Sequence, residues 1–293
     1  MENIKIKGFK NLELNCYLFE PSGKPKAVVQ VIHGMQEHAQ RYEDFANFLA
    51  EKGYVVLTSD LRGHGKTAES IEKLGYNDGD IYEDTLFDQQ IICEFLKNKY
   101  NLPIYIFSHS YGSLITQRLM QVCHIPEKFV LCGTGNGGSF MMGMGNLAAG
   151  FLNLFGQKDK KATSIEKLSL KSYGKEFENG NWLSRDEEVF KKYTADPYCG
   201  GSFPVRFYKS LFSNVTKLND NIDKIPSDKK IFLIAGTADP VGEKGKQVTK
   251  LYNLYISEGK NAKIKLYPGA RHELLNEINK DEVYADILAF FEE

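Results

Sequence analysis

The sequence lacks the features that mark several classes of protein. Its 293 residues carry a net charge of −1, so nothing suggests nucleic acid or an anionic membrane surface as a partner. The five cysteines are scattered and include no Cys-x-x-Cys pair, which favours reduced thiols in a cytoplasmic protein over a disulfide framework or a zinc site. The first residues alternate between charged and apolar types, so they predict a first strand and not a signal peptide.

One long stretch lacks charge altogether. Residues 131–156 contain no Asp, Glu, Lys or Arg, which is a length that could cross a bilayer. Eight glycines and three asparagines in that stretch would make a poor transmembrane helix. It is interpreted as the end of a strand at 129–132, a glycine-rich bend and an apolar helix near 140–155. That helix either packs a small core of its own or forms a surface for acyl chains and transient contact with lipid, which would place the protein at the membrane periphery.

The fold class follows from an alternation of strand and helix patterns. Strand patterns occupy residues 4–9, 12–19, 27–33, 54–58, 104–107, 129–132, 230–235 and 263–267, and helical spacings follow most of them. Such alternation predicts an α/β protein with a mostly parallel sheet covered by helices on both faces. Residues 134–225 break the rhythm. We expect a core made of residues 1–133 and 226–293, with 134–225 inserted as a mainly helical cap.

A serine lies at the corner between a predicted strand and a predicted helix. The pentapeptide Ser-His-Ser-Tyr-Gly at 108–112 resembles the Gly-x-Ser-x-Gly elbow, in which the serine hydroxyl is held out of the sheet and the helix N–H groups face the attacked carbonyl. Ser108 replaces the first glycine of that pattern, and Gly112 lets the backbone approach closely. Ser110 is the candidate nucleophile; the alternative is that it only caps the helix.

Two later loops carry the groups that a nucleophilic serine requires. Asp239 follows the strand at 230–235 and His272 follows the strand at 263–267, and the order Ser110, Asp239, His272 is that of an α/β-hydrolase triad. The alternatives are a turn residue before a proline for Asp239 and a surface loop residue for His272.

The developing oxyanion needs N–H donors. The amide of Tyr111 would be one, and the amide of Met35, aimed by Gly34, would be the other. His33 is then expected to hold this loop in place and not to act as a second base.

Several motifs resemble those of monoacylglycerol lipases and the related lysophospholipase-like α/β-hydrolases. The segment at 33–42 matches their H-G-x-x-E-H-x-x-R-Y signature, and residues 60–65 are similar to their D-x-R-G-H-G turn. Residues 181–185 with 195–197 resemble their cap pattern. Asp60, Arg62 and His64 are interpreted as residues that brace neighbouring loops.

The resemblance implies a serine hydrolase that cleaves a small-molecule acyl ester, most directly a monoacylglycerol or a lysophospholipid-type ester, through an acyl-enzyme. It also implies Ser110, Asp239 and His272 as the triad and no metal or organic cofactor. A peptidase or thioesterase on the same fold stays open, because fold and triad do not determine the substrate. A catalytically inactive, hydrolase-like binding module is the further alternative.

Overall fold

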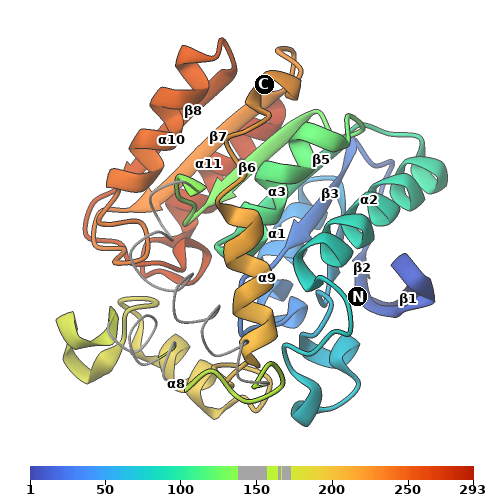
Figure 1. Ribbon diagram of the computed structural model, residues 1–293. Helices are drawn as coiled ribbons and strands as arrows, with labels where there is room; N and C mark the ends of the chain where they lie inside the picture. The colour runs from blue at the N-terminus through green and yellow to red at the C-terminus, as the bar shows by residue number, and fades with distance from the viewer. Residues whose placement is uncertain (138–156, 164–165, 167–172) are drawn as a thin grey trace.

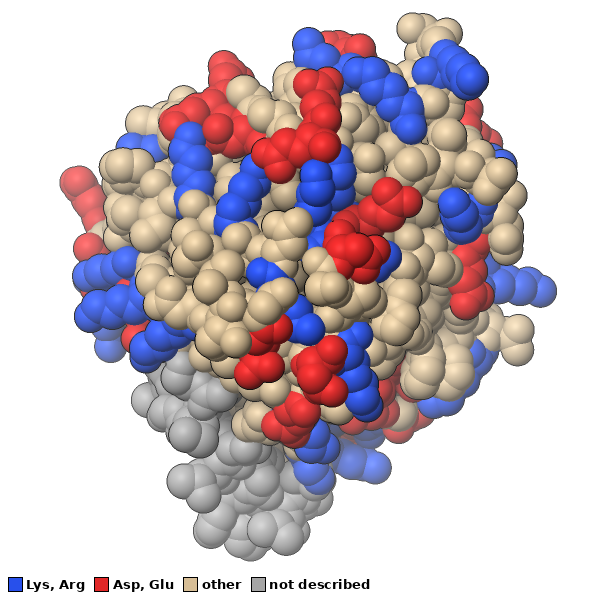
Figure 2. All heavy atoms as spheres, turned by 90° about the horizontal axis from the view of Figure 1, so that it is seen from above, with Lys and Arg blue, Asp and Glu red and all other residues tan. Residues whose placement is uncertain are grey.

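The computed structural model describes residues 1–137, 157–163, 166 and 173–293 (Figure 1). The predicted apolar helix near 140–155 lies outside the described residues. Among those that are described, no helix combines the length and the apolar character needed to cross a membrane. On the face shown in Figure 2, acidic and basic side chains are interleaved, as the near-zero net charge leads one to expect.

The strands form one eight-stranded sheet in the order β1-β2-β4-β3-β5-β6-β7-β8. All of its members are paired in parallel except β1 and β2, which run antiparallel to their neighbours. The strands are β1 (Glu2–Lys7), β2 (Glu13–Phe19), β3 (Ala27–Ile32), β4 (Tyr54–Ser59), β5 (Ile104–His109), β6 (Lys128–Cys132), β7 (Lys230–Gly236) and β8 (Asn261–Tyr267). The predicted α/β sheet is therefore confirmed, and solved structures with the same architecture are described below.

Helices cover both faces of this sheet because its central strands are apolar on both sides. The described helices are α1 (Glu43–Glu51), α2 (Ile81–Tyr100), α3 (Tyr111–Val122), α8 (Glu187–Ala195), α9 (Val205–Val215), α10 (Lys246–Ser257) and α11 (Lys280–Glu292). Apolar side chains of α1 and α11 pack on one face, and those of α2, α3 and α10 pack on the other. Figure 1 shows these layers on either side of the strands.

Helix α2 is longer than the apolar spacing at 87–96 indicates. It begins at Ile81 because the side chain of Asp80 accepts hydrogen bonds from the N–H groups of Tyr82 and Glu83, which caps the first turn. Phe87, the first residue of that apolar spacing, is 41% exposed and stacks on Phe9 instead of entering the core.

The described parts of the segment between β6 and β7 lie against the core at several points. Ser210 of α9 accepts a hydrogen bond from the N–H of Tyr82 at 3.0 Å, which joins α9 to the first turn of α2. The N–H of Gly200 donates to the carbonyl oxygen of Gln36, and the N–H of Glu273 donates to that of Leu183. These contacts fasten the segment to the loops that follow β3 and β8.

Candidate active site

Ser110 lies at the sharp corner between β5 and α3. Its φ of +49° and ψ of −117° are a conformation that residues with a side chain rarely adopt, and such strain is retained mainly at functional sites. The N–H of Ser110 donates to the carbonyl oxygen of Cys132 on β6, which holds the corner. A Cβ on Gly112 would lie 2.4 Å from the carbonyl oxygens of Ile32 and His33, so only glycine lets α3 start this close to the end of β3.

Ser108 is accommodated by its own hydrogen bond. The side chain is fully buried, and its hydroxyl donates to the carbonyl oxygen of Val130 on β6 at 3.1 Å. A serine therefore fits where the usual elbow has glycine, because the buried hydroxyl has an acceptor.

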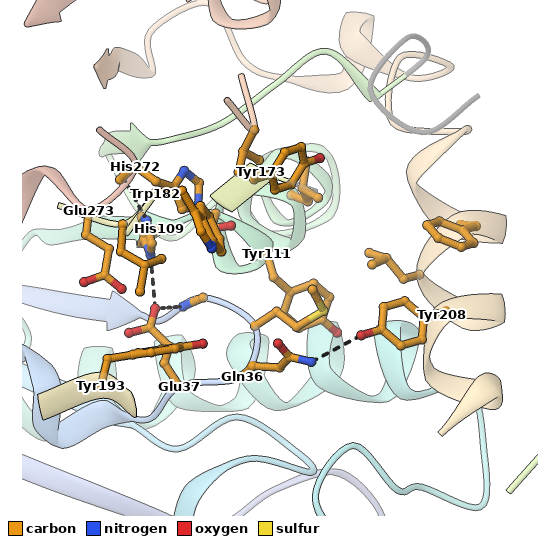
Figure 3. Close-up of a pocket in the computed structure, with 18 residues that line it drawn as sticks. Gln36, Glu37, His109, Tyr111, Tyr173, Trp182, Tyr193, Tyr208, His272 and Glu273 are labelled. Carbon is orange, nitrogen blue, oxygen red and sulfur yellow. Dashed lines mark hydrogen bonds and ion pairs between the residues drawn. The ribbon is translucent and has the colours of Figure 1, made fainter. Parts of the chain in front are cut away.

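His272 and Asp239 form a buried pair at the carboxyl ends of β8 and β7. Nδ1 of His272 lies 2.9 Å from Oδ2 of Asp239, and since a carboxylate only accepts, Nδ1 carries the proton. The other carboxylate oxygen accepts from the N–H of Val241 at 2.9 Å. The imidazole packs against the rings of Trp182 and His109, at centroid distances of 5.3 and 4.7 Å (Figure 3). This leaves Nε2 as the nitrogen available for a proton transfer.

A single pocket joins the predicted residues that face a substrate. Ser110, His272, Met35, Tyr111 and Gly34 all line it, and Asp239 lies behind His272. The rest of its wall is largely apolar or aromatic and includes Leu114, Tyr173, Trp182, Leu183, Tyr193, Leu211, Phe212 and Val241. At one end Gln36 and Tyr208 add polar groups, and Gln36 donates to the Tyr208 hydroxyl at 3.3 Å (Figure 3).

His33 lies behind this pocket and braces the loop that follows β3. Its Nε2 accepts from the N–H of Leu61 at 2.9 Å, so Nδ1 is the protonated nitrogen and donates to the carbonyl oxygen of Gly34 at 2.7 Å. Burial lowers the pKa of His33 to about 4, which keeps the ring neutral near pH 7. Asp60 supports the same loop by accepting from the N–H of Ala39 at 2.9 Å.

A buried charge network under the pocket was not assigned any role from the sequence. Oε1 of Glu37 accepts hydrogen bonds from the N–H of Gly34, from the hydroxyl of Tyr42 and from Nδ1 of His109. Arg41 donates to the other oxygen of Glu37 and binds both carboxylate oxygens of Glu273. The spacing of Glu37 and Arg41, four residues apart in the quoted signature, is the signal that could have indicated an ion pair.

The network determines the ionisation of its members. Burial alone would raise the pKa of Glu37, but Arg41 and His109 hold it well below its usual range. Burial lowers the pKa of His109 and the Glu37 carboxylate raises it, with a net upward shift. A protonated His109 can use its second nitrogen as well, and Nε2 lies 3.2 Å from the carbonyl oxygen of His272. The network thus connects the loop of Gly34 and Met35 to the backbone of His272.

Comparisons with known proteins identify relatives of this chain. A family model described as serine aminopeptidase, S33, matches residues 23–279. The chain is 28% identical over 276 residues to the human monoglyceride lipase, covering 90% of this chain and 81% of the relative. It is 26% identical over 279 residues to a monoglyceride lipase homolog of monkeypox virus, covering 93% and 90%. A thermostable carboxyl esterase from Bacillus coagulans, solved in complex with glycerol, superposes with a TM-score of 0.90 at 26% identity over 99% of this chain and 97% of the esterase.

Proposed function

The chain belongs to the family described as serine aminopeptidase, S33; it is a carboxylic ester hydrolase of the α/β-hydrolase fold, and we propose that it cleaves monoacylglycerols or lysophospholipid-type acyl esters. The observation that carries the proposal is the pairing of His272 with Asp239 in a pocket that also holds Ser110 at a strained corner. The names of the relatives support glycerol esters as the substrate class.

In the proposed mechanism Nε2 of His272 takes the Ser110 proton while the serine oxygen attacks the ester carbonyl. The N–H groups of Met35 and Tyr111 receive the developing oxyanion. Tyr111 is the first residue of α3, so the positive end of the helix dipole adds to this stabilisation. His272 then protonates the leaving alcohol and activates the water that releases the acid. Asp239 holds the histidine in the required tautomer and stabilises the imidazolium.

The pocket wall supports a lipid-like acyl group. Leu114, Leu211, Phe212 and Val241 offer apolar surface for a chain. At the Gln36 and Tyr208 end the donor hydrogens are already bound to Glu166 and to the Tyr208 hydroxyl, which leaves acceptor oxygens for the hydroxyls of a substrate. Acceptors at one end and apolar walls elsewhere suit an ester with a small polar alcohol. Transient contact of the inserted segment with lipid surfaces is part of the same proposal.

The family description makes an aminopeptidase the second candidate. Such an enzyme needs an uncompensated carboxylate for the α-ammonium group of its substrate. Among the described residues that line the pocket, the carboxylates are Glu37 and Glu273, and both are already bound by Arg41. All four carboxylate oxygens already accept a hydrogen bond, so an ammonium group would have to displace Arg41 or a backbone N–H, which favours the ester.

A pair of serine variants tests the mechanism. We expect Ser110→Ala to lower kcat on p-nitrophenyl esters and monoacylglycerols by about 10⁴-fold or more. Ser108→Ala is the matched control, because that serine lies two residues away and only bonds to a backbone carbonyl; its kcat should stay within about threefold. If Ser110→Ala kept a near-normal kcat, Ser110 could not be the nucleophile. If kcat/KM were higher on an aminoacyl-proline amide or an acyl-CoA than on any monoacylglycerol, the proposed class of ester substrates would be excluded.

A further inference from the structure

Outside the pocket, three side chains with metal-ligating atoms converge. His38, Asp196 and Cys199 each direct one donor atom into a space where all three atoms lie within 4.8 Å of one another, the one such group found in the described part of the chain. Nε2 of His38 is 2.9 Å from Oδ2 of Asp196. His38 follows β3, whereas Asp196 and Cys199 follow α8, so the group joins the core to the inserted segment.

The donor set has a definite chemical preference. One imidazole nitrogen, one carboxylate oxygen and one thiolate sulfur suit a borderline divalent cation such as zinc; magnesium and calcium take oxygen ligands. Zinc bonds of about 2.0 to 2.3 Å in a tetrahedron separate ligand atoms by about 3.4 to 3.6 Å. The present separations, all within 4.8 Å, would change by about 1.4 Å at most, a shift within reach of side-chain rotation.

Neighbouring groups already orient two of the donors. The N–H of Tyr198 donates to Oδ1 of Asp196 at 2.8 Å, which turns Oδ2 toward His38. The Tyr198 ring packs against His38 edge to face at 6.2 Å. Arg41 is the nearby cation, and its charge is balanced by Glu37 and Glu273. Oriented ligands of this kind reduce the ordering that metal binding has to impose.

The three side chains are also accessible to solvent, and acidic residues predominate around them. His38, Asp196 and Cys199 line a cavity of about 510 Å³, from which water could reach a fourth coordination position. The acidic residues lining the same cavity outnumber the basic ones: Glu43, Asp44, Asp186, Glu188, Asp196, Glu277 and Asp281 against Arg41, Lys192 and Lys280. A cavity lined by an excess of one charge concentrates ions of the opposite sign.

We propose that His38, Asp196 and Cys199 form a binding site for a zinc-like divalent cation that clamps the inserted segment to the loop after β3. The cation replaces the thiol proton of Cys199, which is released to solvent as the metal–sulfur bond forms. The same two segments are already joined where the N–H of Gly200 donates to the carbonyl oxygen of Gln36 at 2.9 Å. Met35, the neighbour of Gln36, faces the pocket, so the clamp would act beside the candidate active site.

Cobalt(II) provides the direct test because its absorption reports its ligands. The full chain, stripped with a chelator, is titrated with Co²⁺. We expect one equivalent to produce the near-ultraviolet charge-transfer absorption of a cobalt–thiolate bond and the visible bands of a tetrahedral ion. Cys199→Ser should abolish the charge-transfer absorption and weaken the affinity at least tenfold. Cys123→Ser is the matched control, because Cys123 is equally buried (7% exposed against 8%) and lies outside the group.

A measurement of thermal stability provides a second test that does not depend on the Cys199→Ser variant. Zinc at a hundredfold excess over its Kd should raise the Tm of the unmodified protein by about 4 °C. His38→Gln can keep a hydrogen bond to Asp196 but removes a ligand, so its Tm without metal should be near normal and its zinc-induced shift should be lost. No thiolate absorption at saturating cobalt would overturn the proposal. Absorption that survives in Cys199→Ser, or a zinc shift that survives in His38→Gln, would overturn it too.

Discussion

The substitution Glu37→Gln tests whether the charge network under the pocket positions the loops of Met35 and His272, to which we assign catalytic roles. Glu37 is 3% exposed, and its Oε1 atom lies 2.6 Å from the N–H of Gly34 and 3.0 Å from Nδ1 of His109. Glutamine has the same shape but carries no charge, and its amide NH₂ has to face a donor, either His109 or Arg41. The variant therefore removes the interaction that holds the loop of Met35 and the backbone of His272 in one arrangement.

The expected magnitude follows from the contacts that the variant removes. Removing one partner of a buried ion pair costs about 3 to 5 kcal/mol when the other charge is left unpaired. Arg41 keeps both oxygens of Glu273, so we expect a smaller cost of about 2 to 3 kcal/mol, which in a protein of this size lowers the Tm by about 3 to 5 °C. Removing an oxyanion donor outright costs 10²- to 10³-fold in kcat. Since Glu37→Gln only displaces that loop, we expect kcat to fall by about 10- to 100-fold with a smaller change in KM.

Urea unfolding and ester hydrolysis at 25 °C measure the two effects separately. Asp88→Asn is the matched control, because Asp88 is fully buried, is paired with Arg62 and lies outside the pocket. Asp88→Asn should lose at least as much stability as Glu37→Gln, because Arg41 keeps Glu273 whereas Arg62 loses its carboxylate partner, but only Glu37→Gln should lose kcat. If Asp88→Asn lowers kcat as much as Glu37→Gln does, the effect is one of general stability and the positioning role is refuted. Unchanged stability of Glu37→Gln would refute the network itself.

Further predictions concern pH and the elbow. Burial lowers the pKa of His33 to about 4 and that of His64 to about 3, below the unfolded value of 6.5. The two histidines therefore make their full contribution to the free energy of unfolding above pH 6.5, and this contribution is lost as the pH falls toward the folded-state pKa values. The raised pKa of His109 acts in the opposite sense and offsets part of the loss. Urea unfolding should therefore give a free energy about 3 kcal/mol lower at pH 5 than at pH 7, and an equal value would contradict the pKa shifts. Ser108→Gly should lower the unfolding free energy by about 1 to 2 kcal/mol through the lost hydrogen bond and the added chain freedom, with kcat within about threefold; a larger loss of kcat would mean that Ser108 acts in catalysis. Gly112→Ala should reduce stability by about 1 to 3 kcal/mol and kcat at least tenfold, because its Cβ meets two backbone oxygens at 2.4 Å, and wild-type kinetics would exclude that close approach.

The arrangement of strands and helices was predictable because the hydrophobic pattern of most segments matches the strand or helix that they form. Apolar runs such as residues 27–33 can be buried only as a strand covered on both faces, and the structure places β3 at Ala27–Ile32. The start of α2 does not follow from apolar spacing, because that spacing begins only at Phe87. The capping residue Asp80 was the stronger signal for the start of that helix.

The sequence by itself determined the parallel sheet, the corner at Ser110 and the presence of Asp239 and His272 beyond strand ends. These depend on periodicity and chain order, which are local properties. Only the tertiary structure decided which distant charges meet. His109 contacts Glu37 from 72 positions away, and Arg41 binds Glu273 from 232 positions away. His38 reaches Asp196 across 158 positions, so no spacing of histidines and cysteines along the chain could indicate a metal site. Such contacts arise where the loops at the carboxyl edge of the sheet fold together, and their partners are selected by burial and charge balance instead of by distance along the chain.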